Sequence, residues 1–145
     1  MECRRLSDKD INEISKLYVD YYNNHEDGCW TLEKATKRIS QYITMNDSMC
    51  LGIYENQNLI GFVLGYYKVF DDIIGYYLEE IVIDGKFQNK GHGSFLIKEL
   101  EKIVDSDGAS IIELSSVNDE KHMHFYKKLG FFVSKNIILM GKFLK

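Results

Sequence analysis

Apolar residues recur along this chain with two different spacings, and the two spacings predict two kinds of element. A recurrence every three or four positions marks one face of a helix, whereas runs of β-branched and aromatic residues between turn-forming residues mark strands. The helical spacing predicts helices at residues 11–21, 32–43, 94–104 and 122–129. Strands are predicted at residues 2–6, 49–54, 59–70, 78–83 and 110–115, with the last strands inside residues 131–144.

These elements follow one another closely along the whole chain. No repeat, low-complexity tract or linker interrupts them, and the chain contains no proline. A length of 145 residues, 45% of them hydrophobic, is enough to bury a sizeable core. We therefore expect one α/β domain over residues 1–145.

One short loop carries the strongest chemical signal. The sequence Gln88-Asn89-Lys90-Gly91-His92-Gly93 lies between a predicted strand and a predicted helix. In such a turn, backbone N–H groups converge on an anion at the helix N-terminus, and glycines let the backbone approach phosphate oxygens closely. The dinucleotide fingerprint would need a third glycine where Leu96 stands, and a triphosphate loop would need Lys followed by Ser or Thr where Ser94-Phe95 stand. Both of these phosphate loops are therefore excluded.

The spacing Gln-x-x-Gly-x-Gly after a strand resembles the pyrophosphate loop of the GNAT superfamily of acyl-CoA-dependent N-acyltransferases. Downstream, the sequence Phe125-Tyr126-Lys127-Lys128-Leu129-Gly130-Phe131 is similar to the C-terminal signature of the same family. The resemblance implies an α/β (α+β) fold with a mixed, mostly antiparallel sheet of six to seven strands flanked by about four helices.

The resemblance also implies how acetyl-CoA would be held as the co-substrate. The backbone of the strand before the loop would contact the pantetheine arm, and the loop with the first helical residue would hold the pyrophosphate. Asn118, one position before the place where relatives often carry asparagine, is a further candidate contact. The implied cofactor-binding residues are Ile81, Val82, Ile83, Gln88, Asn89, Lys90, Gly91, His92, Gly93, Ser94 and Asn118.

The chemistry that the resemblance implies is direct attack of an amine on a thioester, which requires a base for the amine and a proton donor for the departing thiolate. Tyr126 matches the family tyrosine near the cofactor sulfur and is the expected general acid. Glu79 and Glu80 interrupt an apolar strand, and strict alternation predicts that they serve opposite faces of the sheet. We prefer Glu79 as the base and assign Glu80 to acceptor binding. The alternative is that one of the two merely pairs with a neighbouring Arg or Lys.

The acceptor is less well defined by the sequence. A net charge of −4 and a pI near 5.6 argue against nucleic acid and favour a small cationic amine. Tyr22 and Trp30 could bind such a cation through their rings, although aromatics at this spacing also suit a core. A protein N-terminus or lysine is the alternative acceptor, and a non-catalytic acyl-CoA-binding sensor domain is the alternative function.

Several other classes of site and location are disfavoured. Cys3, Cys29 and Cys50 are odd in number and widely spaced, and no metal site is expected among the cysteines and histidines. The longest apolar stretch, residues 59–70, is too short to cross a bilayer, and the first residues lack the apolar core of a signal peptide. We expect a cytoplasmic enzyme with no membrane association, either a monomer or a homodimer.

Overall fold

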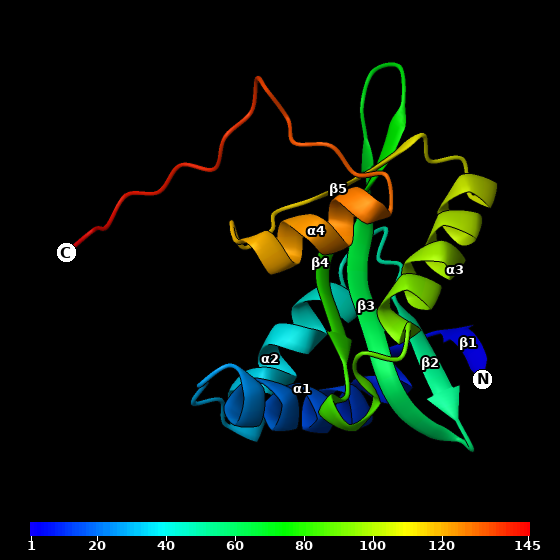
Figure 1. The fold of residues 1–145 in the computed structure, drawn as a ribbon, viewed down its shortest axis with the longest axis vertical. Coiled ribbons are helices and arrows are strands. Elements are labelled where there is room, and N and C mark those ends of the chain that lie inside the picture. The colour runs from blue at the N-terminus through cyan, green and yellow to red at the C-terminus, as the bar shows by residue number, and fades with distance from the viewer. The chain divides into compact units, whose positions relative to one another are not determined.

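The computed structural model describes residues 1–145, which form two compact units, Met1–Leu114 and Ser115–Lys145. Figure 1 labels the elements of both units. The first unit contains β1 (Glu2–Arg5), α1 (Ile11–His25), α2 (Leu32–Ile43), β2 (Leu51–Glu55), β3 (Asn58–Val69), β4 (Ile74–Ile83), α3 (His92–Ser106) and β5 (Ile111–Leu114), with 3₁₀ turns at Asp8–Asp10 and Gly85–Phe87. The second unit contains α4 (Glu120–Lys128).

The first unit is built on one sheet of five strands in the order β1-β2-β3-β4-β5. The strands from β1 to β4 pair antiparallel, and β5 pairs parallel to β4. This confirms the mixed α/β class and the four helices. The expectation of six to seven strands is wrong, because residues 131–145 form no strand. An extended segment becomes a strand only when a neighbouring strand bonds its backbone, and these residues pair with none.

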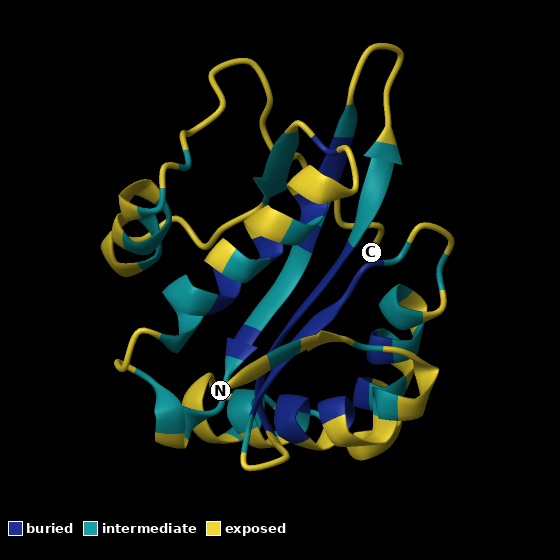
Figure 2. Cartoon of the chain, turned by 90° about the vertical axis from the view of Figure 1, so that its right-hand side faces the viewer, coloured by how far each residue is buried: buried dark blue, intermediate teal, exposed yellow.

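Helices cover both faces of the sheet. Ile14 and Leu17 of α1 and Ile39 of α2 pack in one cluster with Phe62 and Leu64 of β3. The intervening strand residues turn to the other face, where α3 packs against β3 and β4. The buried side of α3 consists of Leu96, Ile97, Leu100 and Val104. Figure 2 shows the buried residues along the central strands and on the helix sides that face them.

Capping groups explain where the helices begin and end. The Thr31 hydroxyl accepts a hydrogen bond from the Lys34 backbone N–H at 3.2 Å, so Thr31 caps α2. In the second unit, the Asp119 carboxylate accepts from the His122 backbone N–H at 2.7 Å and starts α4. After α4, Gly130 has a φ of 94°, in the left-handed region that glycine adopts without strain. The chain contains no helix that is long and apolar enough to span a bilayer.

Candidate functional site

A β-bulge at Glu79 is the main irregularity of the central sheet. In the β3–β4 pairing, Leu64 lies opposite Glu80 and Gly65 lies opposite Leu78, so Glu79 has no partner on β3. One extra residue breaks the alternation of side chains along β4. Glu79 and Glu80 therefore do not serve opposite faces, and that prediction is wrong. Both carboxylates reach the Arg38 guanidinium, whose Nη2 lies 3.4 Å from Glu79 Oε1 and 2.8 Å from Glu80 Oε2.

The sequence carries a signal for this bulge at Gly65. A Cβ built on Gly65 would lie 2.2 Å from the Tyr76 hydroxyl and 2.5 Å from the Tyr77 carbonyl oxygen. Only glycine permits β4 to approach this closely. A single glycine inside an apolar strand pattern is a known indicator of a bulge or a close backbone approach.

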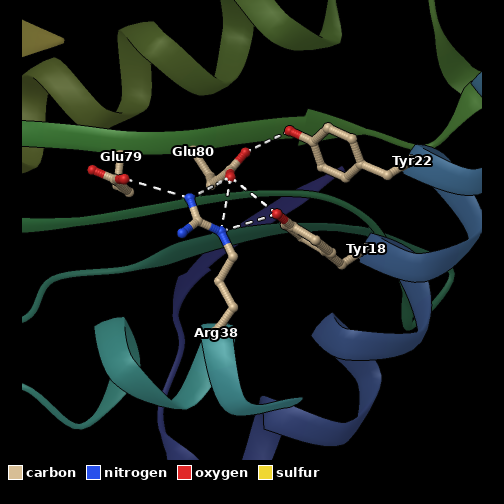
Figure 3. Close-up of polar contacts among 5 residues, drawn as sticks. All are labelled: Tyr18, Tyr22, Arg38, Glu79 and Glu80. Carbon is tan, nitrogen blue, oxygen red and sulfur yellow. Dashed lines mark hydrogen bonds and ion pairs between the residues drawn. The ribbon is translucent and has the colours of Figure 1, made fainter. Parts of the chain in front are cut away.

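Glu80 lies at the centre of a buried hydrogen-bond network (Figure 3). Its Oε1 accepts from the Tyr22 hydroxyl at 2.6 Å, and its Oε2 accepts from the Tyr18 hydroxyl at 3.2 Å. Arg38 donates to the same Oε2 from Nε at 3.2 Å and from Nη2 at 2.8 Å. The Glu80 side chain is only 12% exposed. Tyr18 and Tyr22 belong to α1 and Arg38 belongs to α2, so these hydrogen bonds connect both helices to the sheet at Glu80.

The protonation states of this network are well defined. Burial, followed by the charge of Glu80, raises the pKa of Tyr18 and of Tyr22 far above the usual range. Burial alone would lower the pKa of Arg38, but the hydrogen bonds and charges of Glu80 and Tyr18 together outweigh it, so the net effect raises that pKa. Both tyrosines thus remain hydrogen-bond donors, and Arg38 remains a cation, at any physiological pH.

Glu79 is the less constrained of the two carboxylates. Its side chain is 23% exposed, and its contact with Arg38 is the longer one. Two half-buried tyrosines lie beside it: burial and a hydrogen bond to Glu79 raise the pKa of Tyr42, while burial and the charge of Glu79 raise that of Tyr66. Glu79 therefore combines partial exposure with a partly apolar, aromatic setting.

These tyrosines belong to a row that the sequence analysis missed. The ring centroids of Tyr42 and Tyr66 are 6.4 Å apart, and those of Tyr66 and Tyr77 are 5.7 Å apart. Tyr66 and Tyr77 are cross-strand partners in the β3–β4 hairpin. Asp71 and Asp72 lie midway between residues 66 and 77 along the chain, so a turn at these aspartates brings the two tyrosines opposite each other.

The predicted acceptor residues Tyr22 and Trp30 gather around Tyr18. The Trp30 ring meets the Tyr18 ring edge-on with centroids 4.9 Å apart, and Tyr22 lies 4.5 Å from the same ring. The Asn23 side chain holds the Trp30 backbone through two hydrogen bonds of 2.8 and 2.9 Å. Tyr18 is 2% exposed and belongs to the core, and Tyr22 and Trp30 are partly buried against it.

The glycine loop joins β4 to an uncapped helix. Gln88 donates from Nε2 to the Ile83 carbonyl oxygen at 3.0 Å, which fixes the start of the loop. Asn89 and Gly91 have φ values of 60° and 82°, both left-handed. Gly91 is the N-cap of α3, and no side chain bonds the N–H groups of the first helical turn. Those groups, at His92 and the next residues, therefore point outward along the helix axis, an arrangement that can bind an anion.

The C-terminal half of β4 has a strand on one side only. β5 pairs with Gly75–Leu78, whereas Ile81, Val82 and Ile83 pair with β3 alone. The Ile83 carbonyl is taken by Gln88, and the remaining backbone groups on this side are available to an extended ligand. The bulge, the part of β4 that pairs with β3 alone and the glycine loop thus follow one another along the chain.

Of the remaining predicted residues, Tyr126 and Asn118 lie in the second unit, and Lys90 lies in the glycine loop of the first. Tyr126 is half-buried on α4, with its ring edge-on to Phe125 at 5.0 Å and to Phe131 at 5.5 Å. Asn118 is exposed, directly before the helix cap Asp119. Lys90 is exposed, with its Nζ 5.7 Å from the centre of the Phe87 ring. Across the chain, no group of three or more His, Cys, Asp or Glu side chains is placed to hold a metal ion.

Comparison with known proteins finds similarity to acetyltransferases in sequence and in structure. Residues 11–131 match the acetyltransferase (GNAT) family. A 54-residue stretch is 39% identical to the uncharacterized N-acetyltransferase CgeE of Bacillus subtilis (strain 168), covering 37% of this chain and about a fifth (21%) of that protein.

Two solved structures share the fold at low sequence identity. A ribosomal-protein-alanine N-acetyltransferase from Brucella melitensis biovar Abortus 2308 is 16% identical with a TM-score of 0.79, over 98% of this chain and 100% of the other. The aminoglycoside N-acetyltransferase AAC(6′)-Iy in complex with CoA is 14% identical with a TM-score of 0.75, over 97% and 93%.

Proposed function

Because the chain belongs to the acetyltransferase (GNAT) family, we propose that it is an N-acetyltransferase that moves the acetyl group of acetyl-CoA to a small cationic amine. One observation carries this proposal. A single stretch from Glu79 to Ser94 supplies a partly exposed carboxylate at a bulge, an open strand edge and an uncapped helix N-terminus, in that order. This order suits a long ligand with a reactive group at one end and phosphates at the other.

The loop and the strand edge would bind the donor. N–H groups of His92, Gly93 and Ser94, at the positive end of α3, would hold the pyrophosphate. The left-handed turn at Asn89 and Gly91 aims those groups outward, and Lys90 adds a positive charge. Backbone groups of Ile81 and the N–H of Ile83, which point away from β3, would bond the pantetheine arm as an added strand, whereas the Val82 backbone faces β3. The solved relative that binds CoA supports this assignment.

Glu79 would act as the base. As the amine nitrogen attacks the carbonyl carbon, its proton passes to Glu79 and the carbon–sulfur bond breaks. Glu80 is less suited to this role, because four hydrogen bonds from Tyr18, Tyr22 and Arg38 already occupy its carboxylate oxygens. Arg38 would hold both carboxylates in place. We propose that Tyr22 and Glu80 support the site through this network.

Tyr126 would protonate the departing thiolate. Its ring is fixed between Phe125 and Phe131, which limits its rotation within the second unit. In a Tyr126→Phe variant we expect kcat to fall by about 10²-fold, the lower range for general acid catalysis, with little change in the Kd for acetyl-CoA. An unchanged kcat would remove Tyr126 from the mechanism.

A small cationic acceptor is supported by the surroundings of Glu79. Tyr42 and Tyr66 offer aromatic faces beside its carboxylate, a combination that attracts ammonium groups. The net charge of −4 adds a weak attraction for cations. The relative AAC(6′)-Iy is an aminoglycoside acetyltransferase, whereas the relative from Brucella is a ribosomal-protein-alanine acetyltransferase, so the shared fold accommodates both acceptor classes.

Release of the CoA thiol from acetyl-CoA, followed across a panel of amines, tests the proposal. The panel would contain a monoamine, a linear polyamine, an aminoglycoside and peptides with a free N-terminus or lysine. We expect the highest kcat/KM with the polyamine or the aminoglycoside. A preference for a peptide would overturn the acceptor class. Tight acetyl-CoA binding without turnover on any amine would favour the sensor function.

A further inference from the structure

A row of three tyrosine rings lies beside the carboxylate of Glu79. The ring of Tyr42 on α2 lies 6.4 Å from that of Tyr66 on β3, and the ring of Tyr77 on β4 lies 5.7 Å from Tyr66 on the other side. We call these three residues the tyrosine row. All of them belong to the first unit, and each is only partly buried. The proposed reaction uses the part of the row next to Glu79 and leaves the outer end at Tyr77 unexplained.

Two cations of the protein itself lie over the end rings of the tyrosine row. The central guanidinium carbon of Arg38 lies 5.4 Å from the centre of the Tyr42 ring, and the two carboxylates of β4 hold it there. At the other end, Lys68 Nζ lies 4.9 Å from the centre of the Tyr77 ring. The face of a tyrosine ring attracts a cation within about 6 Å of its centre. The row is therefore a surface that binds cations, and a side chain of the protein already lies at each end.

The two cations are held with different strength. Arg38 has two carboxylate partners, whereas Lys68 forms no ion pair, so its ammonium group is held by the Tyr77 ring alone. The sheet explains this contact. Lys68 lies opposite Gly75, which has no side chain, and Tyr77 is its diagonal neighbour across the β3–β4 pair, within reach of a long side chain. The flexible stem of Lys68 can leave the ring at small cost, while Arg38 is fixed.

The spacing of the rings decides what Lys68 does to an acceptor. An acceptor amine at Glu79 would lie beside Tyr66, the middle ring of the row. The next ring, Tyr77, is 5.7 Å away, a separation that the two nitrogens of a short linear diamine can span. A second ammonium group of the acceptor would therefore reach the Tyr77 ring, where Lys68 lies. Two positive charges at one ring repel each other, so binding of the second ammonium group requires that Lys68 move away.

We propose that Lys68 is a specificity-determining residue of the acceptor site, because it occupies the position on the tyrosine row that the second ammonium group of a linear diamine or polyamine would take. This inference rests on the proposed function and narrows its acceptor class. In the wild type, Lys68 weakens the binding of the second ammonium group without affecting the first. When the charge of Lys68 is removed, the Tyr77 ring becomes a second cation-binding position, and linear diamines become better acceptors.

Steady-state turnover of matched amines tests this proposal. Diaminobutane and butylamine differ only in the second amino group, as do diaminohexane and hexylamine. In Lys68→Met, which keeps the stem and removes the charge, we expect kcat/KM to rise roughly three- to tenfold for the diamines through a lower KM, the range for one cation–aromatic contact. The values for the monoamines should not change. Lys68→Arg should behave as the wild type, and so should Lys102→Met, which removes the same charge from an exposed position on α3.

Removal of the Tyr77 ring distinguishes a binding position on that ring from simple charge repulsion. In the double variant Lys68→Met, Tyr77→Leu, the gain for the diamines should disappear. Calorimetric Kd values for the same amines repeat the comparison without turnover, so a failure of acetyl transfer on every amine would overturn the proposed function and still leave Lys68 tested. Equal diamine preference in Lys68→Met and the wild type, by turnover and by Kd, would overturn the inference. A gain that survives the loss of Tyr77, or that Lys102→Met shows as well, would also overturn it.

Discussion

At the scale of single residues, the two adjacent glutamates of β4 have different surroundings, and we propose different roles for them on that ground. Glu80 is 12% exposed and accepts hydrogen bonds from Tyr18, Tyr22 and Arg38, whereas Glu79 is 23% exposed and has one longer contact to Arg38. A carboxylate whose lone pairs are filled stabilises the fold, and one that is only partly engaged can accept a proton. This division supports Glu79 as the base.

The tyrosines of this network predict a loss of stability at alkaline pH. Burial and the charge of Glu80 raise the pKa of Tyr22 in the folded protein, while the unfolded chain ionises its tyrosines near pH 10. Above that pH the folded state binds more protons than the unfolded state, so stability falls as pH rises. The free energy of unfolding by urea should fall between about pH 9 and 11, and less steeply in Tyr22→Phe. Equal slopes in both proteins would contradict this assignment.

At the scale of elements, the turn into α3 depends on the left-handed backbone conformation of Gly91. A Cβ on Gly91 would meet nothing within 4 Å, but its φ of 82° is strained for other residues. Gly91→Val should therefore weaken acetyl-CoA binding far more than it lowers the chemical rate, by at least about tenfold in Kd, or 1.4 kcal/mol.

Gly108 provides the matched control for this change. It has a φ of 98°, with equally open surroundings, but it follows the C-terminal end of α3. Gly108→Val should cost similar stability and leave the Kd for acetyl-CoA, measured by calorimetry, unchanged. A normal Kd in Gly91→Val would refute the loop assignment.

The bulge of β4 depends on Gly65 in the same way. Its added Cβ would lie 2.2 Å from the Tyr76 hydroxyl, so Gly65→Ala must shift β4 and with it Glu79. Overpacking of this kind typically costs about 1–3 kcal/mol, and we expect kcat to fall along with the melting temperature. Gly75→Ala on the same hairpin meets its nearest atoms only at 3.3 Å and should be much milder. Similar effects of the two substitutions would argue against a special role of the bulge.

At the scale of the whole molecule, local patterns predicted most elements and missed the contacts between distant ones. The spacing of apolar residues predicted α2 at its observed bounds, and the glycine loop was predicted between β4 and α3. The bulge at Glu79 depends on how β3 and β4 pack, and the Arg38–Glu80 contact joins residues 42 positions apart. Neither follows from local periodicity.

The strands predicted within residues 131–144 show the same limit of local patterns. The composition of residues 131–144 favoured strands, and that prediction is wrong, because a strand also needs a neighbouring strand to bond its backbone. Within one chain these residues form none.

The turnover of acetyl-CoA by Glu79→Gln tests the central claim most directly. With the best amine of the panel, we expect kcat to fall by about 10²- to 10³-fold, as for loss of a general base. The Kd for acetyl-CoA and the melting temperature should stay unchanged, and a Glu55→Gln control on β2 should keep wild-type turnover. A Glu79→Gln enzyme with wild-type kcat across the pH range would contradict the account.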